Sequence, residues 1–251
     1  MSATAPTMSQ PPRTRIKICG LTREQDVDAA VQAGADAVGF VMYPPSARHV
    51  SAARAAELAR RLPPFVTPVL LFVNEAPAAV AAACALLPHC ILQFHGDETP
   101  EQCLAASAGG TRPWLRAARI PLDDAAVPFD LLKFVSDHHR AQAILLDAHV
   151  EGFGGGGKAF NWSRLPPSVN APLVLSGGLT PANVADGILQ VRPRCPSLAV
   201  DVSSGVELSG NGGVILKGVK DAEKIHRFVA AVRAADRQLA ESLLHVPLPA
   251  T

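Results

Sequence analysis

The chain has 251 residues, of which 48% are hydrophobic and 18% are charged, so it can bury the core of one large α/β domain or of two smaller ones. Its 23 basic and 22 acidic residues give a net charge of +1, which excludes the basic field that holds nucleic acids. Five cysteines without a C-x-x-C pair argue against a disulfide framework or a zinc site. No apolar run approaches the roughly 20 residues that span a bilayer, and the N-terminus lacks a secretory signal, so we expect a cytoplasmic protein without a membrane partner.

Short apolar runs bounded by turn residues predict eight strands in chain order. They cover residues 15–19, 37–42, 67–73, 90–96, 113–120, 141–148, 171–177 and 197–203. Helical patterns lie between them. The first is expected to be capped by Thr22 and to stop at Gly34, and others follow Ser51 and Thr99.

Alternating strands and helices require parallel pairing, and eight such units match a closed (β/α)8 TIM barrel. An open doubly wound sheet is the alternative, because hydrophobic periodicity does not show closure. We expect a single barrel domain at residues 15–236. A flexible N-terminal extension, 1–14, precedes it, and a C-terminal tail, 237–251, follows it.

In such barrels the chemistry lies at the C-terminal ends of the strands. Several polar residues stand where the apolar runs stop, namely Lys17, Cys19, Arg48, Asn74, Gln93, His95, Arg116, Asp147, Ser176 and Asp201. Structural roles compete with functional ones at these positions. A strand cysteine is often a small buried hydrophobe, Gln93 and His95 are as compatible with a core as with a ligand, and Asp201 can simply pair with Lys17.

Three glycine-bearing stretches occur late in the chain: 152–158 (GFGGGGK), 176–183 (SGGLTPAN) and 201–207 (DVSSGVE). Glycine allows positive φ and close approach of the backbone, so successive N–H groups can hold a phosphate. Barrels often bind phosphate in the loops after strands seven and eight. We therefore expect a phosphorylated small-molecule substrate. In the second stretch, Thr180 is the expected helix cap and Pro181 the first helical position.

The ordered motifs KICGLT (17–22), GFVMYPPSARHV (39–50), QFHGDE (93–98), LLDAHVEGFGGGGKAFNW (145–162), LSGGLTPANV (175–184), AVDVSSGVE (199–207) and KGVKDAEKI (217–225) resemble those of the phosphoribosylanthranilate isomerase family. The resemblance covers residues 15–230. It implies a (β/α)8 enzyme of tryptophan biosynthesis that converts N-(5'-phosphoribosyl)anthranilate to 1-(2-carboxyphenylamino)-1-deoxyribulose 5-phosphate. This Amadori rearrangement is expected to need no cofactor, no metal and no obligate protein partner.

The reaction needs an acid for the ring oxygen and a base for the C2 proton, and we assign these roles to Asp147 and Cys19. Either barrel dipoles or the nearby Lys17 are expected to provide an electropositive setting that favours the Cys19 thiolate. Substrate-binding roles are expected for Lys17, Arg48, Gln93, His95 and Asp201, with Arg48 facing the anthranilate carboxylate unless it is a solvated surface arginine. The residues expected to bind phosphate are Gly155, Gly156, Gly157, Ser176, Gly177, Gly178, Ser203, Ser204 and Gly205.

The sequence departs from the family pattern at three positions. Gly156 replaces a threonine whose hydroxyl would contact phosphate, Asn161 replaces an aspartate, and His49 stands where tyrosine is common. Three other functions are compatible with such a barrel: a phosphate-sugar epimerase, an indole-glycerol-phosphate synthase and a non-catalytic phosphate-binding barrel. Cys19 on the first strand together with Asp147 on the sixth argues against all three.

Overall fold

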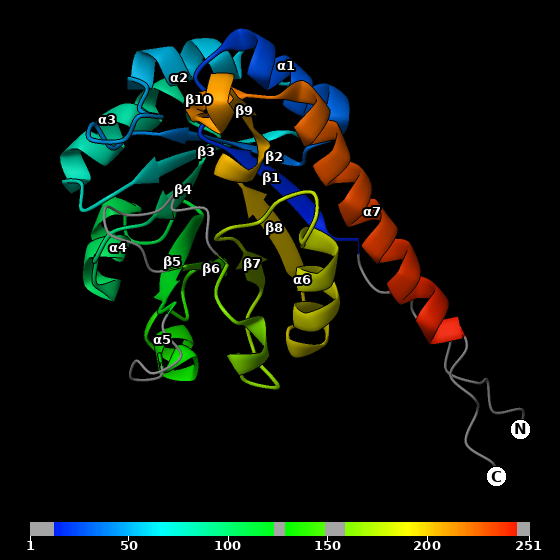
Figure 1. Cartoon of the computed structure of the whole chain (residues 1–251). Helices are drawn as coiled ribbons and strands as arrows, with labels where there is room; N and C mark the ends of the chain where they lie inside the picture. The colour runs from blue at the N-terminus through cyan, green and yellow to red at the C-terminus, as the bar shows by residue number, and fades with distance from the viewer. Residues whose placement is uncertain (1–12, 123–128, 149–158, 245–251) are drawn as a thin grey trace, which may run out of the picture.

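The computed structural model describes residues 13–122, 129–148 and 159–244, and within them eight parallel strands form a closed barrel (Figure 1). Each strand pairs with the next in sequence, and the last pairs with the first, which brings Asp201 opposite Lys17. The predicted barrel is therefore confirmed and the open sheet is excluded. The strands are β1 (Arg15–Cys19), β2 (Ala37–Val41), β3 (Thr67–Phe72), β4 (Ile91–Phe94), β5 (Trp114–Ile120), β6 (Ala143–Ala148), β7 (Leu173–Leu175) and β8 (Leu198–Val202).

Helices surround the barrel in the described part of the chain (Figure 1). They are α1 (Glu24–Ala33), α2 (Ala52–Ala59), α3 (Pro77–Leu86), α4 (Pro100–Ala106), α5 (Leu131–Asp137), α6 (Val184–Val191) and α7 (Ala222–Leu244). The alternation is less regular than predicted between β6 and β7. There, described residues 159–172 contain only a short 3-10 helix, η1 (Trp162–Arg164). Further 3-10 turns are η2 (Arg192–Arg194), η3 (Ser204–Val206) and η4 (Asn211–Gly213).

Local capping explains where several helices begin and end. The Ser51 side chain accepts a hydrogen bond from the Arg54 N–H, Thr99 forms a capping box with Gln102, and Gly34 ends α1 in the left-handed conformation at φ 90°. The predicted cap at Thr22 is wrong. Its hydroxyl donates instead to the Gly218 carbonyl, 2.7 Å away, and so ties the first loop to a distant part of the chain.

Strand alternation separates two buried faces. On β1, Ile16 and Ile18 join the main hydrophobic core, which lies between the barrel and its helices. The intervening residues, Lys17 and Cys19, point to the barrel interior, where Cys19 packs with Val41 and Leu71. Three of the other cysteines, Cys84, Cys90 and Cys103, are buried and pack in the main hydrophobic core.

Regular structure extends beyond the expected C-terminal boundary of the domain, and contacts tie Thr14 to it at the N-terminal boundary. Thr14 is buried and its N–H and hydroxyl donate to Asp236 on α7, while Arg192 donates to the Thr14 hydroxyl. Helix α7 continues past residue 236 as far as Leu244. The remaining parts of the expected extension and tail, 1–12 and 245–251, lie outside the described residues. Among the helices described, none is long and apolar enough to cross a membrane.

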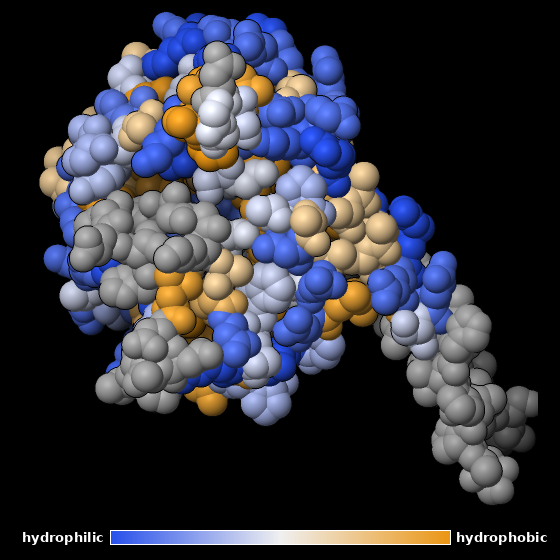
Figure 2. Space-filling model, in the orientation of Figure 1, coloured by the Kyte–Doolittle hydropathy of each residue, from blue (hydrophilic) through white to orange (hydrophobic). Residues whose placement is uncertain are grey.

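An antiparallel hairpin that the sequence did not predict follows η3. Its strands, β9 (Glu207–Ser209) and β10 (Ile215–Lys220), pair Glu207 with Lys220 at the hairpin base. Leu208, Val214, Ile215 and Leu216 are exposed on it, and Figure 2 shows this apolar patch surrounded by hydrophilic surface at the top of the view. The hairpin lies beside the first loop of the barrel, because Gly218 on β10 receives the Thr22 hydrogen bond.

Candidate active site

The polar residues predicted at the strand ends lie together at one mouth of the barrel. The carboxyl ends of the parallel strands all lie on the same side of the barrel. Eight of these ten residues are buried: Lys17, Cys19, Arg48, Gln93, His95, Arg116, Asp147 and Asp201. Burial removes water, which strengthens the electrostatic contacts among them.

Lys17 and Asp201 form a buried ion pair beside Cys19. Lys17 Nζ lies 2.9 Å from Asp201 Oδ1. A Cβ added at Gly39 would come within 2.7 Å of Cys19 Sγ and 3.1 Å of Lys17 Nζ. Glycine at position 39 therefore keeps open the space in which the thiol and the ammonium group meet.

The electrostatic setting of Cys19 differs from the expectation. Burial raises the pKa of the Cys19 thiol, and the nearby Lys17 opposes this rise without reversing it. Burial would lower the pKa of Lys17 itself, but Asp201 and Cys19 hold it above its ordinary value. Lys17 thus remains a cation beside the thiol, although its pairing with Asp201 shares that charge.

Asp147 lies at the start of a hydrogen-bonded row that crosses from β6 to β4. Its Oδ2 is 2.9 Å from His95 Nε2, and His95 Nδ1 is 2.9 Å from Gln93 Nε2. The Gln93 amide can only donate through Nε2, so a neutral His95 carries its proton on Nε2 and donates it to Asp147. The Ala148 N–H donates to the other oxygen, Asp147 Oδ1. The carboxyl group is therefore held from two sides.

The loop after β7 packs against the end of β6. Gly177 and Gly178 have φ of 75° and 64°, and a Cβ at Gly177 would come within 2.8 Å of Asp147 Oδ1. The predicted helix start at Thr180 and Pro181 is wrong by three residues, since α6 begins at Val184. The intervening turn is closed by Asn183, which accepts from the Thr180 N–H and donates to the Gly178 carbonyl.

The loop after β8 touches the loop after β7. A Cβ at Gly205 would overlap the Leu179 carbonyl oxygen and lie 2.9 Å from its carbon. The 3-10 turn η3 begins with Ser203 as its N-cap, followed by Ser204 and Gly205. The first N–H groups of such a turn need acceptors from outside it. Together with Ser176, Gly177 and Gly178 they form a backbone-rich rim suited to an anion. The other predicted phosphate ligands, Gly155, Gly156 and Gly157, lie outside the described residues.

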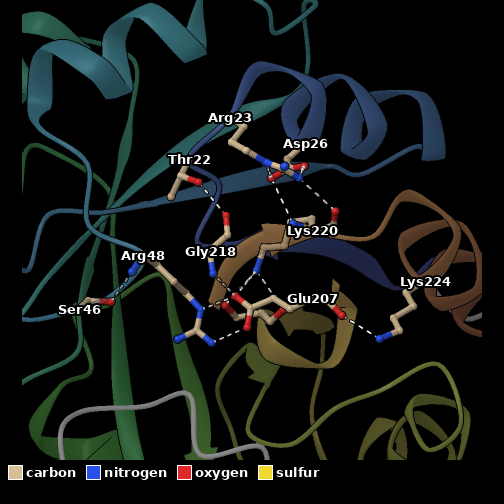
Figure 3. Close-up of polar contacts among 10 residues, drawn as sticks. Thr22, Arg23, Asp26, Ser46, Arg48, Glu207, Gly218, Lys220 and Lys224 are labelled. Carbon is tan, nitrogen blue, oxygen red and sulfur yellow. Dashed lines mark hydrogen bonds and ion pairs between the residues drawn. The ribbon is translucent and has the colours of Figure 1, made fainter. Parts of the chain in front are cut away.

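Arg48 is buried, which excludes the solvated surface arginine. It follows β2, and its guanidinium holds Glu207 through two hydrogen bonds: Nε to Oε1 at 2.7 Å and Nη2 to Oε2 at 2.8 Å (Figure 3). Glu207 was not predicted as a site residue, although it ends the motif AVDVSSGVE. The only signal in the sequence is that a charged residue follows the last barrel strand by a few positions.

Two further residues named from the sequence make structural contacts. Arg116, one of the polar residues at the strand ends, donates to the carbonyls of Phe94, Gly96, Glu98 and Ala117 from a buried position. Asn161, which departs from the family pattern, accepts from the N–H of Ser163 and so begins η1. These contacts give neither residue a role in a chemical step.

Comparison with known proteins places the chain among proteins of one activity. Residues 16–231 match the family model for N-(5'phosphoribosyl)anthranilate (PRA) isomerase. A relative with that enzyme name from Methylibium petroleiphilum is 62% identical over 230 residues, covering 92% of this chain and 99% of the relative. One from Leptothrix cholodnii is 61% identical over 226 residues, covering 90% and 94%.

Solved structures agree in fold. A phosphoribosyl anthranilate isomerase from Thermotoga maritima matches with a TM-score of 0.67 at 36% identity, covering 88% of this chain and 99% of that one. Another, in complex with reduced 1-(o-carboxyphenylamino)-1-deoxyribulose 5-phosphate, matches with a TM-score of 0.64 at 34% identity and the same coverage.

Proposed function

The chain belongs to the N-(5'-phosphoribosyl)anthranilate isomerase family, and from this premise we propose how its residues share the reaction. The protein is an isomerase of tryptophan biosynthesis that converts N-(5'-phosphoribosyl)anthranilate to 1-(2-carboxyphenylamino)-1-deoxyribulose 5-phosphate. Family membership decides against the epimerase, the synthase and the non-catalytic barrel.

Asp147 is the general acid that protonates the ring oxygen, and Cys19 is the general base that removes the C2 proton. The observation that carries this assignment is their placement on β6 and β1 at the same mouth, each beside a different electrostatic partner. Asp147 lies within hydrogen-bond distance of His95, whereas Cys19 lies beside the cation of Lys17, which lowers the pKa of the thiol against the effect of burial. The reaction needs an acid and a base on the two sides of the substrate, and these two side chains face the same mouth.

The remaining residues bind and orient the substrate. His95 and Gln93 fix the Asp147 carboxyl, and Asp201, held by Lys17, faces the ribose hydroxyls. The rim formed by Ser176, Gly177, Gly178, Ser203, Ser204 and Gly205 holds the phosphate, and Gly155, Gly156 and Gly157 complete it. Arg48 binds the anthranilate carboxylate, because a guanidinium matches a carboxylate in two parallel hydrogen bonds.

We place the enzyme in the cytoplasm, without a cofactor, nucleic acid or obligate protein partner. The net charge of +1 supports the absence of a nucleic-acid partner. A proton-transfer reaction with an acid and a base supplied by side chains needs no electron carrier.

The experiment follows the loss of the fluorescent anthranilate substrate. Cys19→Ser and Asp147→Asn should each lower kcat by about a hundredfold or more, the range expected for a general acid or base. Cys195→Ser and Asp137→Asn change the same residue types after η2 and at the C-terminal end of α5, and should keep near-normal kcat. Normal turnover by either Cys19→Ser or Asp147→Asn would refute the assignment.

A further inference from the structure

Three charged side chains meet beside the barrel mouth: Arg48, Glu207 and Lys220 (Figure 3). The Glu207 and Lys220 side chains are fully buried, and that of Arg48 is only 10% exposed. Lys220 Nζ lies 3.2 Å from Glu207 Oε1, and Arg48 holds both carboxylate oxygens. Isolated buried charges are costly, so a cluster kept at this position calls for a role.

Glu207 cannot rotate freely in this cluster. Its Oε1 accepts from Arg48 Nε, from Lys220 Nζ and from the Gly218 N–H at 2.8 Å. The Lys224 side chain on α7 also donates to the Glu207 carbonyl, at 2.8 Å. Because these donors fix the orientation of the Glu207 carboxylate, Arg48 can bind it in only one orientation.

Arg48 keeps unused donors on the edge that Glu207 does not touch. A guanidinium has five N–H groups, and Glu207 takes one from Nε and one from Nη2. Among the described residues, no acceptor is assigned to Nη1, which points away from Glu207 in Figure 3. The Nη1–Nη2 edge therefore remains open to a second carboxylate.

The charges of the cluster also suit a second carboxylate. Arg48 and Glu207 alone would be neutral, and a second carboxylate on the same guanidinium would be repelled by Glu207. Lys220 brings the cluster to a net charge of +1. Burial, together with the charge of Arg48, lowers the pKa of Lys220, and the contact with Glu207 opposes that change without reversing it.

We propose that Glu207 and Lys220 are positioning residues for the anthranilate carboxylate. Glu207 holds the Arg48 guanidinium so that its Nη1–Nη2 edge faces the mouth, and Lys220 offsets the charge of Glu207. The inference rests on the proposed role of Arg48 in the isomerase reaction. Neither residue touches the reacting atoms. Both act on binding, so their loss should raise KM more than it lowers kcat.

The test compares two ligands that differ only in the carboxyl group. One is reduced 1-(o-carboxyphenylamino)-1-deoxyribulose 5-phosphate, and the other is the same compound without the carboxyl on its ring. The quantity measured is the ratio of their dissociation constants. Lys220 also donates to Ser203 in the phosphate rim, and any change transmitted through that contact cancels in the ratio.

Glu207→Gln and Lys220→Met should each reduce the preference for the carboxylated ligand by about tenfold, as for a weakened hydrogen bond to a charged group. In an Arg48→Ala background neither change should reduce it further, because the group they position is gone. Glu98→Gln is the matched control. Glu98 is another buried glutamate near an arginine, Arg116, and its loss should affect both ligands equally.

Each possible outcome decides between explanations. If Glu207→Gln tightens the carboxylated ligand, Glu207 competes with the substrate and the positioning role is wrong. Equal weakening of both ligands, no change, or a further loss of preference in the Arg48→Ala background would also overturn the inference. If Glu207→Gln does not fold, Lys220→Met decides alone. Turnover of the substrate by the unmodified enzyme is measured separately, and its absence would refute the proposed function instead.

Discussion

Gly205 lies where the loops after β7 and β8 touch, and replacing it with alanine should separate them. The new Cβ would overlap the Leu179 carbonyl oxygen and lie 2.9 Å from the carbonyl carbon and 3.2 Å from Thr180 Cα. These neighbours are backbone atoms, so no side chain can rotate away. Because ordinary contact begins at 3.4 Å, relief of the overlap with the Leu179 oxygen requires the two loops to move apart by more than about one ångström.

The expected cost has two parts. Overpacking of this kind destabilises a fold by about 1–3 kcal/mol. Since the same two loops form the proposed phosphate rim, their separation should also raise the Kd for ribose 5-phosphate and the KM for substrate, by about tenfold. Thermal unfolding measures the first effect, and competition by ribose 5-phosphate in the fluorescence assay measures the second.

Gly34→Ala is the control for Gly205→Ala. Gly34 has φ of 90° and nothing within 4 Å of its added Cβ, so alanine there costs about 1–2 kcal/mol of backbone strain far from the mouth. It should lower the melting temperature without changing phosphate affinity. If Gly205→Ala binds ribose 5-phosphate as tightly as the unmodified enzyme, the assignment of the rim between β7 and β8 is wrong.

The other predictions concern pH and metals. Lys17 lowers the pKa of the Cys19 thiol against the effect of burial, so in Lys17→Met the thiolate should form only at higher pH. The rising limb of kcat/KM should therefore move to more alkaline pH, and a limb that stays in place would show that Lys17 does not tune the thiol. A chelator should leave activity unchanged, because no group of three potential metal-binding His, Cys, Asp or Glu side chains occurs among the residues described here. Activity lost with chelator and restored by a divalent cation would contradict this and favour epimerase-like chemistry.

The barrel could be predicted because its signals are local. Each strand is a short apolar run with its own turn residues. The caps Ser51 and Thr99 bond to residues only three positions further along the chain. The hairpin β9–β10 was missed for the opposite reason. Its strands flank a glycine-rich segment, and its register shifts between Ile215 and Lys220, so no alternating pattern marks it.

The sequence predicted which residues lie in the candidate site but not which partners they contact. Strand ends indicated Arg48 and Asp201, yet the Glu207 partner of Arg48 is 159 residues away and no sequence pattern links the two. Lys17 does lower the pKa of the Cys19 thiol, as expected, but the sequence does not show the degree of burial that outweighs this effect. Thr22 failed as a cap because a tertiary partner, Gly218, takes its hydroxyl.

The pairing of β1 with β8 has a consequence for how the protein is made. Lys17 and Asp201 are 184 residues apart, so the ion pair beside Cys19 cannot form until almost the whole barrel has left the ribosome. Until then Cys19 belongs to an incomplete sheet with an open edge, and its thiol is available to oxidants and to other chains. Closing the barrel is therefore also the step that protects the thiol during synthesis.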